Sequence, residues 1–80
     1  MTLRRDEAIA AARKLLRTFA GSPEPRRHAR SIQTTLAGAG GWSPAERNTI
    51  DALGAWLAEM PAEAALRDRC EDVLLGLTRP

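Results

Sequence analysis

The sequence contains few of the residues that metal sites, disulfides and catalytic centres require. Its 80 residues include one cysteine, Cys70, one histidine, His28, one phenylalanine and no tyrosine. A single cysteine cannot form an intramolecular disulfide, and one cysteine with one histidine cannot supply the ligands of a protein-only metal site. We therefore expect a reducing compartment, the cytoplasm, and a chain that holds neither a metal nor a cofactor.

The lone histidine also lacks the neighbours of a catalytic base. Nucleophilic catalysis needs a nucleophile, a base within hydrogen-bond reach and a group that orients the base. His28 lies among Arg26, Arg27 and Arg30, and no serine or cysteine beside it is placed in a turn that would expose a nucleophile. The carboxylates are spread along the predicted helix faces instead of forming pairs. The sequence thus predicts a non-enzymatic protein without catalytic residues, in which His28 is a solvated surface residue.

Long apolar runs are also missing. The segment 31–46 is interrupted by Gly, Thr, Gln and Pro, so it cannot cross a hydrocarbon core as an apolar helix. Charged residues occupy positions 4–7, where a signal peptide would need an unbroken apolar region. We expect a protein that stays in the cytoplasm and has no membrane partner.

The residues that are abundant favour helices. Ala and Leu dominate the apolar residues and Arg and Glu the charged ones, whereas β-branched and aromatic residues are scarce. Apolar residues spaced three and four apart predict helices at about 3–20, 23–37, 44–60 and 61–77. Because short connections place successive helices antiparallel, we expect an all-α, compact, mostly antiparallel four-helix bundle, with residues 1–80 as a single helical domain.

Glycine, serine and proline mark the expected helix ends. Gly21 is placed to end the first helix in a left-handed conformation, and Ser22 to cap the second, with Pro23 at its first position. The motif Ser43-Pro44-Ala45-Glu46 predicts a capping box at the start of the third helix. Pro61 is expected to end the third helix and open the fourth. The glycine-rich segment 37–41 is expected to be a hinge.

The expected core follows from the same spacing. Phe19 is predicted to be buried, Gly54 leaves room for a close neighbour, and the second helix has only a narrow apolar stripe, which makes it the weakest of the four. The third and fourth helices contribute the stripe Ile50, Leu53, Leu57, Met60, Leu66, Cys70, Val73, Leu74 and Leu77.

The two halves of the chain carry opposite charge. Residues 1–40 hold eight Lys or Arg against three acids, and residues 41–80 hold four Arg against seven acids. This asymmetry indicates either two helix pairs that attract each other or an interaction surface. The basic run 26–30, with the basic residues of the first helix, is the best nucleic-acid signal. A small nucleic-acid-binding regulator that uses the first two helices is therefore an alternative function, although only weak contact is expected because stacking aromatics and a basic recognition helix are missing.

Residues left over after the core has been assigned are candidates for binding another protein. Trp42 precedes the third helix, and Leu75 points away from the stripe of its own helix. The arginines of the second helix lie outside its apolar stripe. The candidate partner-binding residues are Arg26, Arg27, Arg30, Gln33, Trp42 and Leu75. For Trp42 and Leu75, packing against a neighbouring helix is an equal alternative, and a homodimer formed through Leu75 is a further one.

The chain resembles the small inhibitors that phages and mobile elements encode. Anti-CRISPR proteins are the best known of these. The resemblance lies in its size, its helicity, its lack of catalytic chemistry, its basic face at 26–30 and the acidic face of its last helix. The resemblance covers the whole chain and involves no specific motif. It implies an inhibitor or adaptor that acts by occlusion, binding a protein or nucleoprotein complex such as a CRISPR effector and blocking target DNA binding or nuclease recruitment.

Overall fold

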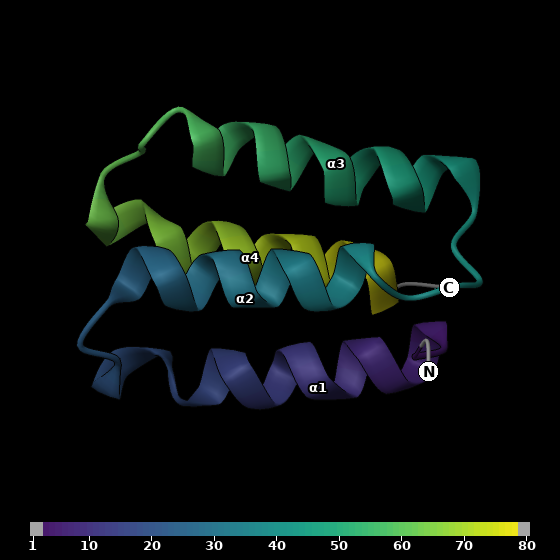
Figure 1. Cartoon of the computed structure of the whole chain (residues 1–80), viewed down its shortest axis with the longest axis horizontal. Coiled ribbons are helices and arrows are strands. Elements are labelled where there is room, and N and C mark those ends of the chain that lie inside the picture. The colour runs from purple at the N-terminus through teal and green to yellow at the C-terminus, as the bar shows by residue number, and fades with distance from the viewer. Residues whose placement is uncertain (1–2, 79–80) are drawn as a thin grey trace.

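Four helices follow one another in up-and-down order. The computed structural model describes residues 3–78. The elements are α1 (Arg5–Arg17), a short 3-10 turn η1 (Phe19–Gly21), α2 (Pro25–Ala37), α3 (Pro44–Ala58) and α4 (Glu63–Thr78). Consecutive helices run antiparallel, so α1 begins and α4 ends at the same end of the bundle (Figure 1). The structure thereby confirms the predicted all-α four-helix bundle.

Helices α2 and α4 form the middle of the bundle. They contact each other, while α1 and α3 lie on opposite sides of this pair (Figure 1). The narrow apolar stripe of α2, which consists of Ala29, Ile32 and Leu36, is fully buried. The helix that the sequence indicates as the weakest therefore packs against all three others, as α4 also does.

The buried residues form one continuous apolar cluster. Phe19 and the expected residues of α3 and α4 belong to it, with one exception. Met60 is wrong as a core residue: it is 67% exposed and has a φ of 57°, in the left-handed region. Among residues 3–78 no polar or charged residue is buried, so the core contains apolar side chains and the Cys70 thiol.

The ends of α1 and α2 differ from the sequence prediction. α1 ends at Arg17, and the chain continues through η1, in which the amides of Gly21 and Ser22 donate to the carbonyls of Thr18 and Phe19. This turn carries Phe19 into the core, and it leaves Gly21 outside the left-handed region. The start of α2 is thereby displaced, so its N-cap is Glu24 instead of Ser22, with Pro25 at the first helical position.

The junctions on either side of α3 show one confirmed and one wrong prediction. The capping box is present: the Glu46 amide donates to Ser43 Oγ at 3.1 Å, and the Ser43 amide donates to Glu46 Oε1 at 3.0 Å. α4 begins at Glu63 and not at Pro61, because the left-handed Met60 turns the chain out of α3 and residues 59–62 complete the reversal.

The expected hinge is held by several hydrogen bonds. Ala39 is buried, and the Gly40 amide donates to the Leu3 carbonyl at 3.0 Å. Arg47 Nη1 donates to the Ala37 carbonyl at 2.9 Å. Only Gly41, with a φ of 91°, uses the conformational freedom of glycine. The segment is thus a fixed crossover between α2 and α3.

Candidate functional site

Three arginines form an exposed basic surface at the start of α2. We call Arg26, Arg27 and Arg30 the arginine face; all three side chains are exposed. Arg30 lies four residues after Arg26 and three after Arg27, the spacings that place side chains side by side on a helix. The sequence folds this way locally because Ala29, Ile32 and Leu36 turn the opposite side of α2 into the core.

The arginines have few partners within the protein. Arg26 Nη1 donates to the Pro61 carbonyl at 2.6 Å, and Arg27 forms an exposed ion pair with Glu24 at 3.3 Å. Among the ion pairs of residues 3–78, none includes Arg30. The face therefore keeps most of its charge and hydrogen-bonding capacity directed to solvent.

The first turn of α2 differs from those of the other helices in its acidic residues. The first turns of α1, α3 and α4 contain acidic residues, as the positive end of the helix dipole favours. The first turn of α2 contains no acidic residue and begins Pro25-Arg26-Arg27. Positive charge at this position is locally unfavourable. The N-cap residue Glu24 pairs with Arg27, so the acidic group nearest this helix end precedes the first turn.

A shallow notch lies beside the arginine face, where the starts of α2 and α4 meet. Its volume is about 340 Å³. The lining combines two prolines with two arginines and two carboxylates: Pro23, Glu24, Pro25, Arg26, Arg27 and Glu63. Because both acidic and basic side chains line it, the notch suits a partner with discrete charges more than a uniformly charged one.

The structure separates the other candidate residues from the arginine face. Gln33 is half-buried between α2 and α3: its Nε2 lies 3.5 Å from the Ile50 carbonyl, and its side chain fills the space that Gly54 leaves. Trp42 packs against the core, and its indole N–H donates to the Leu36 carbonyl at 2.8 Å. That carbonyl is about 15 Å along α2 from Arg26, at 1.5 Å per residue. Leu75 is 48% exposed on the last part of α4.

The position of His28 also differs from the prediction. The ring is half-buried and lies edge-on to Phe19, with 5.1 Å between the centroids. Its Nε2 is in hydrogen-bond contact with the Leu15 carbonyl and lies 3.3 Å from Thr18 Oγ1. His28 therefore occupies the free carbonyl end of α1 and links it to α2, instead of being a solvated surface residue.

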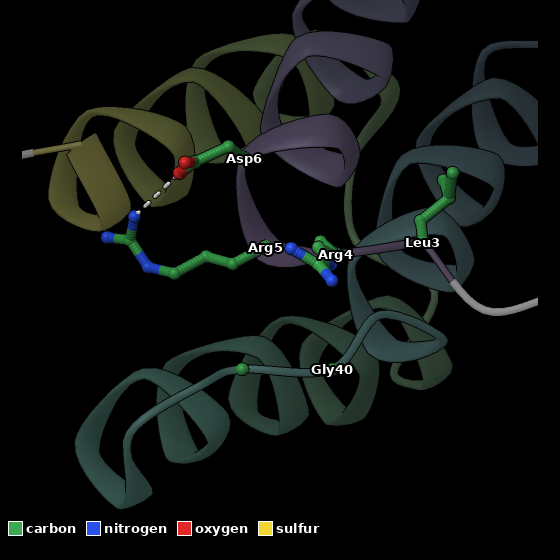
Figure 2. Close-up of a pocket in the computed structure, with 6 residues that line it drawn as sticks. Leu3, Arg4, Arg5, Asp6 and Gly40 are labelled. Atoms are coloured by element: carbon green, nitrogen blue, oxygen red, sulfur yellow. Dashed lines mark hydrogen bonds and ion pairs between the residues drawn. The ribbon is translucent and has the colours of Figure 1, made fainter.

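A larger hollow than the notch beside the arginine face lies at the opposite end of the bundle. It is an open groove of about 580 Å³ between the start of α1 and the crossover at Gly40 and Gly41. Figure 2 shows Arg5 and Asp6 on one side of this groove and Leu3 on the other. Arg5 is engaged in structure, because its Nη2 donates to Glu46 Oε2 at 2.8 Å and to the Leu77 carbonyl at 2.7 Å.

Arg5 and Glu46 perturb each other's titration. The hydrogen bonds from Arg5, with those from Ser43, lower the pKa of Glu46 from 4.5 to about 2. The same contact raises the pKa of Arg5 above its ordinary value. Sequence reasoning missed this pair, because no local spacing relates residues 41 positions apart.

Three further observations bear on chemistry. Cys70 is fully buried, and its desolvation raises the thiol pKa from 9.0 to about 11. Within residues 3–78, no three His, Cys, Asp or Glu side chains gather as a metal site would require. None of the described helices has the length and apolar character needed to cross a bilayer.

Compared with protein-family models, with curated proteins and with solved structures, the chain has no match.

Proposed function

We propose that this chain is a non-enzymatic, cytoplasmic inhibitor or adaptor that binds another protein, or a nucleoprotein complex, and acts by occlusion. The arginine face is the contact surface. The observation that carries the proposal is the positive charge at the N-terminal turn of α2, which the helix dipole disfavours and which few intramolecular contacts offset.

Such a departure from local rules is typical of a functional position. A partner that supplies carboxylates would convert the unfavourable charge into an attractive one. Arginine is suited to this role because its planar guanidinium donates two parallel hydrogen bonds to a carboxylate, and arginines are enriched among the residues that dominate binding energy.

Occlusion requires a rigid surface and no catalytic group. A single apolar cluster holds the four helices together, and the fixed crossover after α2 keeps this helix in place. These features support an inhibitor of the anti-CRISPR kind, in which the arginine face would cover an acidic surface of a CRISPR effector complex and block target DNA binding or nuclease recruitment.

The test is a tagged pull-down from lysate of the source organism, with and without nuclease treatment, read by mass spectrometry. The triple variant R26E/R27E/R30E is compared with R13E/K14E/R17E, which reverses the same number of exposed charges on α1. We expect one protein complex that survives nuclease, is lost with the α2 variant and is kept with the α1 variant. Circular dichroism of both variants controls for folding. Retention of the complex by the α2 variant would remove the arginine face from the model.

One observation favours the alternative, a small nucleic-acid-binding regulator. Because α1 and α2 are antiparallel, the basic last turns of α1, with Arg13, Lys14 and Arg17, lie at the same end as the arginine face (Figure 1). A phosphate surface made from both helices predicts that both triple variants weaken binding. It also predicts an affinity that falls by about 0.9 log unit per contacted phosphate for each tenfold rise in salt. Recovery that disappears with nuclease would favour this alternative.

A further inference from the structure

The turn between α3 and α4 exposes an apolar side chain at a strained position. Met60 is the one non-glycine residue with positive φ in the described part of the chain, and it is 67% exposed. Asparagine or glycine would adopt this backbone conformation more readily than methionine. Asparagine is also more polar than methionine, and glycine is smaller. Core packing does not explain the methionine at this position, because its side chain lies largely in solvent.

This turn and the arginine face belong to one surface. Arg26 Nη1 donates to the carbonyl of Pro61, the residue that follows Met60. Glu63, at the start of α4, lines the same notch as Arg26 and Arg27. The exposed Met60 is therefore the chain neighbour of a residue that Arg26 binds, next to the mixed-charge notch, although Met60 does not line the notch itself.

We propose that the partner presents an acidic protein segment that carries an aliphatic or aromatic side chain. This inference rests on the proposed function and names the chemistry of its partner. Carboxylates of the segment pair with Arg26 and Arg27, and its apolar side chain contacts Met60. Methionine suits such a contact because its side chain is flexible and polarisable and packs well against aromatic rings.

The same features disfavour a nucleic-acid backbone as the occupant. A thioether gains nothing from phosphate, and the carboxylates of Glu24 and Glu63 line the notch beside the arginines. A continuous row of phosphates would meet these two acids, whereas a protein segment can place its carboxylates against the arginines alone.

The experiment is a selection of short random peptides, displayed on phage, against the immobilised protein. The key variant is Met60→Asn, because asparagine tolerates the left-handed conformation and removes the apolar side chain without threatening the fold. Leu75→Asn is the control, since it removes an exposed apolar side chain at a site remote from the arginine face. Arg26→Glu tests the charge.

We expect enriched peptides in which Asp or Glu flanks an aliphatic or aromatic residue. Their affinity should fall about tenfold or more with Met60→Asn and with Arg26→Glu, as for residues central to an interface, and stay unchanged with Leu75→Asn. Enrichment of peptides without acids, no enrichment at all, or equal affinity for Met60→Asn would overturn the inference. So would tighter binding of duplex DNA than of any peptide.

The two proposals fail in different ways. A protein complex that is lost from the pull-down with R26E/R27E/R30E, but binds Met60→Asn as well as the unmodified chain, keeps the proposed function and removes the inference. Failure to recover any nuclease-resistant complex, with no enriched peptides, removes both.

Discussion

The Arg5 guanidinium donates through Nε and Nη2 to one carboxylate oxygen of Glu46, at 3.0 and 2.8 Å. The contact joins the starts of α1 and α3, and Nη2 also donates to the Leu77 carbonyl at the end of α4. Glu46 is at the same time the acidic member of the capping box. Two side chains thus connect three helix ends at one end of the bundle.

The first prediction concerns acid stability. Because the pKa of Glu46 is lowered from 4.5 to about 2 in the folded protein, its ionised form stabilises the fold fully above 4.5. This contribution is lost as the pH falls from 4.5 towards about 2. Urea denaturation at a series of pH values should show that Glu46→Gln is less stable than the unmodified chain near neutral pH, with the difference disappearing at the acid end.

Asp51→Asn is the control for this series, because Asp51 is exposed in the middle of α3. It removes a carboxylate of α3 that takes no part in the Arg5 contact, so it should not reproduce the loss of stability caused by Glu46→Gln near neutral pH. Parallel stability curves for Glu46→Gln and the unmodified chain would show that ionisation of Glu46 does not stabilise the fold.

The second prediction concerns the left-handed Met60. Glycine adopts a φ of 57° without the clash between Cβ and the backbone, so Met60→Gly should raise the free energy of unfolding by about 1 kcal/mol. Met60→Ala removes the same exposed side chain and keeps Cβ, so it should give no gain. Chemical denaturation measures the free energy of unfolding of both variants. If the two variants change it equally, the left-handed backbone conformation of Met60 is not the cause.

The third prediction compares two helical glycines. A Cβ at Gly54 would lie 2.8 Å from Gln33 Nε2, whereas a Cβ at Gly76 would meet nothing within 4 Å. Gly54→Val should therefore destabilise the protein through overpacking between α2 and α3, by about 1 kcal/mol, the low end of overpacking costs, because the end of the flexible Gln33 side chain can shift. Gly76→Ala should stabilise it by up to about 1 kcal/mol through helix propensity.

Thermal unfolding followed by circular dichroism measures both glycine variants. The double variant Gly54→Val with Gln33→Ala offers a check, because removing the obstructing side chain should recover part of the loss. If Gly54→Val unfolds at the same temperature as the unmodified chain, the helices have room that the structure does not show.

The fourth prediction concerns the reactivity of Cys70. The thiol is fully buried in α4, and desolvation raises its pKa from 9.0 to about 11. Because the thiolate is the reactive form, a thiol reagent should modify the native protein only as fast as the protein opens. Modification in urea should be rapid, and fast labelling of the folded protein would contradict the burial.

Much of the fold follows from local patterns in the sequence. The capping box at Ser43 starts α3 where predicted, and the stripe from Leu66 to Leu77 is buried as predicted. These features depend on residues three and four apart, whose relation is set by the helix itself. Gly54 is likewise confirmed as a site of close approach, although the sequence did not show that Gln33 fills the space.

The candidate site was only partly predictable. The arginine face is visible in the sequence because its members are neighbours on one helix, and the structure places all three in solvent. The structure also places Gln33 between helices and Trp42 against the core, far along α2 from Arg26. Nothing in the spacing of residues 50–60 distinguishes Met60 from the core positions before it.

The sequence by itself determined that the chain forms four helices, which apolar stripes they bury, and where its arginines cluster, because these depend on the period of the helix. Only the tertiary structure decided that Met60 leaves the core, that His28 contacts the end of α1, and that Arg5 meets Glu46. Each of these depends on how the chain turns between helices, which brings residues remote in sequence into contact. The combination of Met60 with the arginine face arises in the same way, from the hydrogen bond between Arg26 and Pro61.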